Sequence, residues 1–255
     1  MMASVLQVEG LNKCFDGIRA LTDFSCSVGE REILGFIGPN GAGKTTFFNV
    51  ITGFIRPDGG KASLRGADLL GMPPYKVARA GVARTFQILR LIRRMSVLEN
   101  VLLAFPNQPG ERFWSVFLRP RASARQETAN RKAARALLEE VGLAEKRDDP
   151  ADALSYGQQK LLGLACALIV HPEPKLLLLD EPVAGVNRTL ANRLLDLVRT
   201  MNRTGKTFIV IEHDMPAIMG ICDKVIVLDH GKKIAEGKPQ EIQSNERVIE
   251  AYFGR

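Results

Sequence analysis

A glycine-rich run near the start of the chain has the residue types and spacing that bind a polyphosphate. The stretch from Gly38 to Thr45, GPNGAGKT, fits the phosphate-loop pattern G-x-x-x-x-G-K-[ST]. Its glycines let successive backbone N–H groups converge on an anion, and the helix predicted to follow adds the positive field of its N-terminus. The alternative is a glycine-rich turn that binds nothing. The predicted nucleotide-binding residues are Gly38, Pro39, Asn40, Gly41, Ala42, Gly43, Lys44, Thr45 and Thr46.

Three of these side chains have distinct predicted roles. Lys44 is expected to reach the β- and γ-phosphates of a nucleoside triphosphate, and Thr45 to supply a hydroxyl ligand to Mg²⁺. Thr46 can bond a phosphate oxygen further along.

Two adjacent carboxylates follow a run of four leucines in KLLLLDEPVAGVN. Ligands of an open α/β sheet bind at the carboxyl ends of its strands, so Asp180 and Glu181 are predicted to face the phosphates. Asp180 would hold Mg²⁺ through water, and Glu181 would polarise the attacking water as a general base. Two solvated acids at a strand end are the alternative.

A histidine ends another apolar run, in IVIEHD. At such a strand end, His213 could bond the γ-phosphate or the water. A lone histidine of this kind is more often structural, but the phosphate loop and the two carboxylates favour a catalytic role. His171 and His230 lie in predicted turns and are interpreted as solvated.

Short apolar runs and helical spacings indicate the elements that position these residues. The predicted strands are 4–10, 31–38, 175–181, 206–213 and 223–231. Several read as buried on both faces, which is typical of a largely parallel sheet covered by helices. A helix is predicted over 125–142, two short helices over 238–255, and no strand over 88–170. The segment 88–170 is interpreted as an inserted helical subdomain.

The composition of the chain limits the class of protein, its location and its possible ligands. The 255 residues are 45% hydrophobic and 25% charged, as in a soluble globular protein. The longest apolar run, Leu161 to Val170, is too short to cross a bilayer, and no signal peptide is evident, so a cytosolic location is expected. The four cysteines show no C-x-x-C spacing, which argues against zinc. A net charge of +7 suits phosphates, anionic lipids or nucleic acid alike.

The peptide LSYGQQ, beginning at Leu154, together with these motifs resembles the ATP-binding cassette (ABC) ATPases. Kinases and small GTPases have no counterpart to it. The resemblance implies a single α/β nucleotide-binding domain over 1–255, with a mostly parallel core sheet, an N-terminal antiparallel β subdomain and a helical insertion at about 88–170. It also implies that Ser155, Gly157 and Gln158 grip the γ-phosphate of ATP bound to another subunit. Tyr156 replaces the family's usual glycine.

Three further positions match family motifs. Gln87, in ARTFQ, matches the glutamine that touches Mg²⁺ or the attacking water, and Phe15 matches the aromatic residue that stacks on adenine. Phe15 could instead belong to the core. Asn187 stands where most members have aspartate. The implied cofactors are ATP and Mg²⁺, and the implied catalytic residues are Glu181, His213 and Gln87.

The residue sequences of several segments resemble those of the ATPase subunits of branched-chain amino-acid importers. Within that group the resemblance is to the longer subunit, which has an extra segment before the signature peptide, here 105–127. Importers of urea, amides or aromatic acids are the alternatives. The implied partners are two transmembrane permease subunits, a second ABC ATPase (paralogue or identical copy) and, indirectly, a periplasmic solute-binding protein. The implied location is the cytoplasmic face of the inner membrane, with no nucleic-acid partner.

Three rival functions remain. A soluble ABC ATPase acting on nucleic acid or ribosomes fits the positive charge, although such proteins usually carry two cassettes or a long coiled coil. A kinase or GTPase would share only the phosphate loop. A regulatory cassette with weak hydrolysis is disfavoured by Glu181 and His213. The aromatic and arginine-rich stretch 111–125 could lie on a membrane surface or form a short packed helix.

Overall fold

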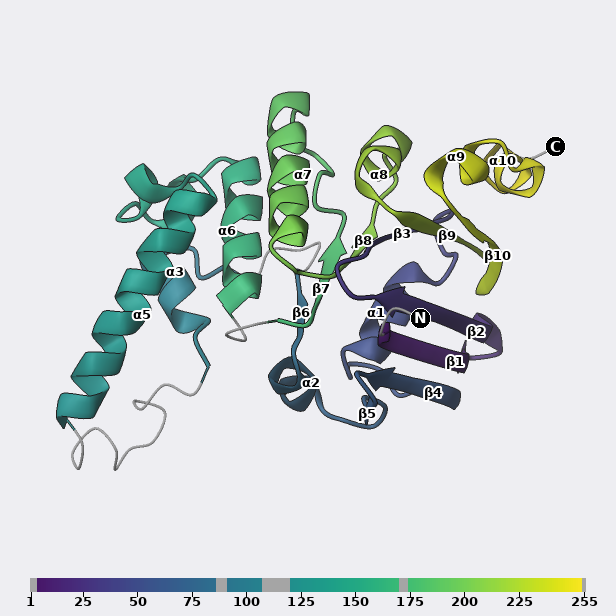
Figure 1. Cartoon of the computed structure of the whole chain (residues 1–255), viewed down its shortest axis with the longest axis horizontal. Helices are drawn as coiled ribbons and strands as arrows, with labels where there is room; N and C mark the ends of the chain where they lie inside the picture. Colours follow the sequence, from purple (N-terminus) through teal and green to yellow (C-terminus); the bar gives the residue numbers. More distant parts are fainter. Residues whose placement is uncertain (1–3, 86–90, 107–119, 170–173, 254–255) are drawn as a thin grey trace. The chain divides into compact units, whose positions relative to one another are not determined.

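The computed structural model describes residues 4–85, 91–106, 120–169 and 174–253. The chain forms two compact units (Figure 1). The first contains residues 1–87, 175–184 and 188–255, and the second contains residues 88–174 and 185–187. Along the described chain, no helix combines the length and apolar character needed to span a membrane.

A six-stranded sheet forms the centre of the first unit. Its strand order is β10-β9-β3-β8-β7-β6, and every neighbouring pair is parallel except β9 with β10. The strands are β3 (Ile33–Ile37), β6 (Val82–Arg84), β7 (Leu176–Asp180), β8 (Phe208–Ile211), β9 (Lys224–Asp229) and β10 (Lys232–Gly237).

The central strands are mostly apolar, and both of their faces are buried. All residues of β3, β7 and β8 are buried, as expected for strands inside a parallel sheet. The predicted strands at 31–38, 175–181, 206–213 and 223–231 are therefore confirmed. The edge strands β6 and β10 were not predicted, since β6 is very short and β10 is mostly polar.

An antiparallel sheet of order β2-β1-β4-β5 completes the β structure of this unit. Its strands are β1 (Ser4–Phe15), β2 (Ile18–Gly29), β4 (Gly59–Leu64) and β5 (Ala67–Asp68). Helix α1 (Lys44–Ile51) shares one core with both sheets. Phe47 of α1 contacts Phe24 of β2 and Phe36 of β3, with ring centroids 5.1 and 4.9 Å apart. These aromatic contacts fix the helix that follows the phosphate loop.

Among its described residues, the first unit contains five more helices: α2 (Pro74–Ala80), α7 (Arg188–Arg203), α8 (Met215–Ile221), α9 (Pro239–Gln243) and α10 (Glu246–Phe253). Helices α9 and α10 confirm the two short C-terminal helices predicted from the sequence.

The second unit is helical over its described residues. It contains α3 (Val97–Leu103), α5 (Pro120–Glu140), α6 (Tyr156–Ile169) and two short 3₁₀ turns at Ala144–Lys146 and Ala151–Ala153. Ser96 caps α3 by accepting the N–H of Glu99, whose carboxylate accepts the N–H of Ser96 in return. The predicted helix at 125–142 corresponds to α5, and Gly142 follows it at a φ of 72°.

Candidate nucleotide-binding and hydrolysis site

The phosphate loop connects β3 to α1, and two of its glycines sit where a side chain would clash with neighbouring backbone. Gly38 has a φ of 151°, and a β-carbon there would lie 2.1 Å from the carbonyl oxygen of Leu228. Gly43 precedes α1 at a φ of 105°, and a β-carbon would lie 2.3 Å from the carbonyl oxygen of Ala20. Glycine is therefore required at both positions, since any side chain would displace the loop.

Neighbouring strands hold this loop in place. The N–H of Gly231, in the turn between β9 and β10, donates to the carbonyl of Ala42 at 3.0 Å. The carbonyl of Gly231 in turn accepts the N–H of Thr22 at 2.8 Å. The turn thus links the phosphate loop to strand β2 through backbone hydrogen bonds alone.

Lys44 opens α1 and turns back over the loop. Its ammonium group donates to the carbonyl oxygens of Gly38 at 2.7 Å and Pro39 at 2.9 Å. An ammonium group has three donors, so these contacts leave one for a phosphate oxygen. The pKa of Lys44 is lowered from its ordinary value, because burial outweighs the opposite effect of the Glu181 and Asp180 carboxylates. Lys44 therefore lies close enough to Asp180 and Glu181 to interact electrostatically with both carboxylates.

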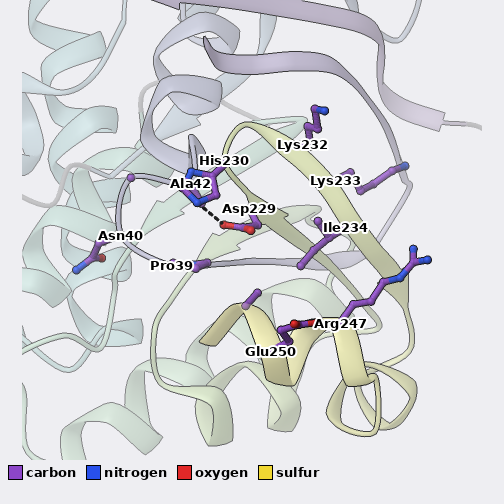
Figure 2. A pocket seen from close by; sticks show the side chains of 12 residues that line it. Pro39, Asn40, Ala42, Asp229, His230, Lys232, Lys233, Ile234, Arg247 and Glu250 are labelled. Carbon is purple, nitrogen blue, oxygen red and sulfur yellow. Dashed lines mark ion pairs between the residues drawn. The ribbon is translucent and has the colours of Figure 1, made fainter. Parts of the chain in front are cut away.

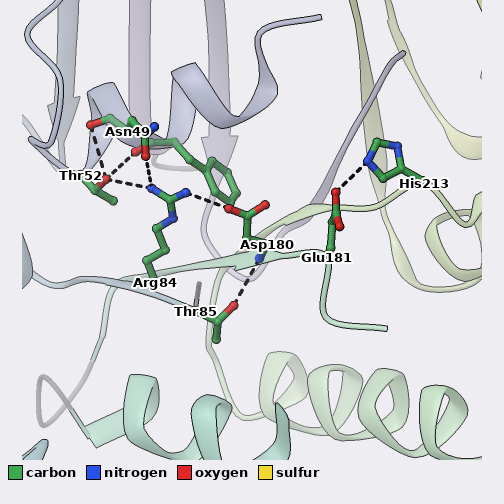
Figure 3. Close-up of polar contacts among 8 residues, drawn as sticks. Asn49, Thr52, Arg84, Thr85, Asp180, Glu181 and His213 are labelled. Atoms are coloured by element: carbon green, nitrogen blue, oxygen red, sulfur yellow. Dashed lines mark hydrogen bonds and ion pairs between the residues drawn. The ribbon is translucent and has the colours of Figure 1, made fainter. Parts of the chain in front are cut away.

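Asp180 ends β7 and makes a buried ion pair (Figure 3). Arg84, the last residue of β6, donates from Nη2 to Oδ2 of Asp180 at 2.8 Å, and the two side chains are 6% and 4% exposed. The same guanidinium donates to Oδ1 of Asn49 at 2.7 Å, and it lies over the ring of Phe48. Asp180 is thereby anchored to β6 and to α1.

Sequence reasoning did not identify Arg84. The signal that could have found it is a charged residue at the end of the apolar run GVAR, one position before Thr85. Thr85 is also engaged, because its hydroxyl accepts the N–H of Asp180 at 3.2 Å.

Glu181 and His213 meet at the ends of adjacent strands. Nε2 of His213 lies 2.8 Å from Oε1 of Glu181, and the side chains are 39% and 16% exposed. Because a carboxylate can only accept, this contact places the proton on Nε2 of the histidine. Glu181 has a φ of 50°, a left-handed backbone conformation that is costly for a non-glycine residue.

Three further predicted residues of the first unit are Thr45, Thr46 and Phe15, which differ in exposure. Thr45 is exposed on the first turn of α1, Thr46 is half-buried, and Asp180 lies at the same sheet edge. Hydroxyl and carboxylate oxygens are the ligands that Mg²⁺ takes, so this donor set fits the ion.

Phe15 ends β1 with 40% of its surface exposed, and the ammonium of Lys13 lies 5.1 Å from its ring centroid. Exposure excludes the core interpretation of Phe15. Gln87 lies outside the described residues.

The signature residues belong to the second unit, at the start of α6. Ser155 accepts the N–H of Gln158 at 3.3 Å, and the side-chain oxygen of Gln158 accepts the N–H of Ser155 at 2.9 Å. This reciprocal cap holds the serine at a helix N-terminus, where its hydroxyl keeps a proton to donate. Tyr156 is 48% exposed and packs over Gly185, and the ammonium of Lys160 lies 5.3 Å from its ring. Gly157 is buried.

A pocket of about 760 Å³ borders the phosphate loop (Figure 2). Its walls are the loop residues Pro39 to Ala42, His230 of the β9–β10 turn, Lys232 and Lys233 of β10, and Arg247 and Glu250 of α10. On the same helix, burial raises the pKa of the Tyr252 phenol above its ordinary value, and the neighbouring backbone of Gly38 offsets part of this rise. The C-terminal helix therefore contacts the loop that the sequence predicts to bind phosphate.

The chain is similar to known proteins over its whole length. Residues 21–184 match the family model described as "ABC transporter", and residues 232–255 match that of "Branched-chain amino acid ATP-binding cassette transporter". The chain is 42% identical to the high-affinity branched-chain amino acid transport ATP-binding protein LivG of Salmonella typhimurium, covering 100% of this chain and 99% of that protein. It is 39% identical to BraF of Pseudomonas aeruginosa, another branched-chain amino acid transport ATP-binding protein, with the same coverage.

A solved structure shares the fold. The ADP conformation of an ATP-binding cassette of an ABC transporter superposes with a TM-score of 0.84 at 33% sequence identity, covering 99% of each chain. The predicted α/β cassette, with its mostly parallel sheet and separate antiparallel sheet, is confirmed.

We predict that Arg84→Met lowers the free energy of unfolding by about 3–5 kcal/mol, because it leaves the buried Asp180 carboxylate without its cation. Urea unfolding of the purified chain measures this. The double variant Arg84→Met/Asp180→Asn should recover most of the loss, since both charges are then gone. A single variant within about 1 kcal/mol of the wild type would mean that the pair contributes nothing to folding.

Proposed function

This chain belongs to the ABC transporter family and is an ATPase of that family, and we propose that it hydrolyses ATP to drive the import of branched-chain amino acids. The observation that carries the proposal for hydrolysis is the pairing of Glu181 with His213 beside a phosphate loop. The similarity to LivG and BraF, together with the match of residues 232–255, supports the choice of solute.

The phosphate loop and Lys44 would bind the triphosphate. Backbone N–H groups of the loop and of the first turn of α1 supply donors, and the ammonium of Lys44 supplies the charge. The exposed ring of Phe15 would stack on the adenine. Thr45, Asp180 and Gln87 would hold Mg²⁺, which when bound neutralises phosphate charge.

Glu181 would act as the general base for the attacking water. Its carboxylate accepts the proton of the water as the oxygen attacks the γ-phosphate. His213 holds the carboxylate through its Nε2 proton and orients it. The 2.8 Å contact supports this role, since a base must keep one geometry to be effective.

The capped serine of α6 would bind the γ-phosphate of a nucleotide held by a second cassette. Ser155, Gly157 and Gln158 surround the N-terminus of α6, which favours anions. In this proposal, ATP joins two cassettes and hydrolysis releases them, so the cycle follows the phosphate contacts. The two units then form a single nucleotide-binding domain, with the helical unit as its insertion.

Membrane partners complete the proposal. Two transmembrane permease subunits would hold the pair of cassettes at the cytoplasmic face of the inner membrane as peripheral subunits. The second cassette would be a paralogue or an identical copy, and a periplasmic protein would deliver the solute. Importers of urea, amides or aromatic acids are the alternatives that the uptake test below separates.

Glu181→Gln should keep ATP affinity within about twofold and lower turnover by at least about 100-fold, because the amide cannot accept the proton of the water. Phosphate release measures turnover, and size-exclusion chromatography should reveal accumulated ATP-bound dimer. Unchanged hydrolysis would remove Glu181 from the mechanism.

Lys44→Ala should abolish nucleotide binding, since it removes the cation of the phosphate loop. Isothermal titration calorimetry with ATP measures the affinity. Lys61→Ala, at an exposed position of β4, is the matched control and should bind like the wild type. Normal affinity in Lys44→Ala would refute the phosphate-loop assignment.

Deletion of the gene should abolish energy-dependent uptake of radiolabelled leucine, isoleucine and valine, and the wild-type chain should restore it. The Lys44→Ala chain should not. Normal uptake of these amino acids in the deletion strain would reject the solute. Lost uptake of labelled urea, amides or aromatic acids instead would assign the chain to one of the alternatives.

A further inference from the structure

A buried carboxylate links the two loops that carry the proposed catalytic pair. Glu212 follows β8 directly and is 2% exposed. Its Oε1 accepts the N–H of Val183 at 2.6 Å, and its Oε2 accepts the N–H of His213 at 3.2 Å. One side chain thus contacts the backbone two residues after Glu181 and the backbone of His213 itself.

The N–H of Val183 needs an acceptor from outside its own loop. Glu181 begins a turn in which the N–H of Ala184 donates to the carbonyl of Glu181 at 3.3 Å, with Pro182 at the second position. The N–H of Val183 points out of this turn, and Val183 is 6% exposed. A buried N–H without an acceptor is costly, so the Glu212 carboxylate makes this turn possible.

The backbone of His213 has left the sheet as well. The last ladder contact between the two strands is the N–H of Glu181 donating to the carbonyl of Ile211 at 2.9 Å. Beyond it, the carboxylate of Glu212 accepts the N–H of His213, and Asp214 caps α8 by accepting the N–H of Ala217. His213 is therefore held between two side-chain contacts rather than by strand pairing.

A carboxylate is an expensive choice for a merely structural position. The four residues of β8 before it are apolar and at most 1% exposed. Burying an ionisable group there costs free energy that an apolar residue would not. Its two oxygens, however, can accept one N–H from each loop at the same time, which no apolar side chain can do.

We propose that Glu212 is a positioning residue for ATP hydrolysis, which fixes the strained turn at Glu181 and the backbone of His213 so that their side chains stay in contact. This inference rests on the proposed function, in which Glu181 and His213 act on the attacking water. It assigns to Glu212 no contact with the nucleotide, so its loss should affect turnover and spare binding.

Glu212→Gln tests the inference with little change of shape. The amide keeps one acceptor oxygen but turns an N–H₂ donor toward the other backbone N–H, so one of the two loops loses its hydrogen bond. Turnover at saturating ATP should fall about 10- to 100-fold, because small displacements of reacting groups have effects of that size. The affinity for ATP and the KM should stay within about twofold.

Asp223→Asn is the matched control. Oδ2 of Asp223 accepts the N–H of Ile33 at 2.8 Å, at the opposite end of β3 from the phosphate loop. It makes the same kind of carboxylate-to-backbone contact away from the site, so its turnover should stay within about twofold of the wild type. Wild-type turnover in Glu212→Gln, or an equal fall in Asp223→Asn, would overturn the inference.

Two further measurements separate the possible failures. Hydrogen exchange in folded Glu212→Gln should accelerate at peptides containing Val183 or His213 and stay unchanged in β3. If the variant does not fold, Glu212→Asp keeps the carboxyl group on a side chain one methylene shorter, and it should show the same turnover defect with normal ATP binding. Wild-type turnover in Glu212→Asp would overturn the inference. If Glu181→Gln hydrolyses ATP normally, the proposed function fails and this inference with it. If Glu181→Gln is inactive while Glu212→Gln is not, only the positioning role fails.

Discussion

The parallel alignment of β3, β7 and β8 is the constraint on which the rest of the site depends. Parallel strands have their carboxyl ends at one edge of the sheet, so whatever follows each strand meets there. The phosphate loop follows β3, Asp180 and Glu181 end β7, and Glu212 and His213 follow β8. Segments far apart in the sequence are thereby brought within hydrogen-bonding distance.

Electrostatic pairing then gives each charged group a different task. The two carboxylates at the end of β7 are adjacent in sequence but have different partners. Asp180 is buried against Arg84, whereas Glu181 turns to His213 near the surface. A carboxylate held by a guanidinium is suited to holding charge in place, and one that meets an imidazole is suited to handling a proton. The roles proposed for the two carboxylates therefore differ because their partners differ.

The C-terminal segment contacts the phosphate loop, although the two are far apart in the sequence. Gly231 donates to Ala42 of the loop, and the Tyr252 phenol lies beside Gly38. The segment 232–255, which matches the branched-chain amino acid transporter model, therefore supports one wall of the pocket beside the loop. A segment that matches the branched-chain amino acid transporter model thus adjoins the phosphate loop.

Local residue pattern was enough to predict the buried strands, the phosphate loop and the identity of its lysine. Four leucines followed by two acids predict a core strand that ends at a polar edge, and a Gly-rich run before Lys-Thr predicts a phosphate loop, because its backbone can adopt conformations that need glycine. The strands β2 and β4 lack such an apolar run, since one of their faces is partly exposed, and they were not predicted.

The pairing of side chains could not be predicted in this way. Arg84 and Asp180 are 96 residues apart, and Glu212 reaches Val183 across 29 residues. A sequence shows which residues can ionise, but long-range partners follow from strand order and register, which place Asp180 opposite Ile211 and bring the two loops together. Residue chemistry was therefore readable from the chain, whereas the contact geometry that directs it arises from packing among distant strands.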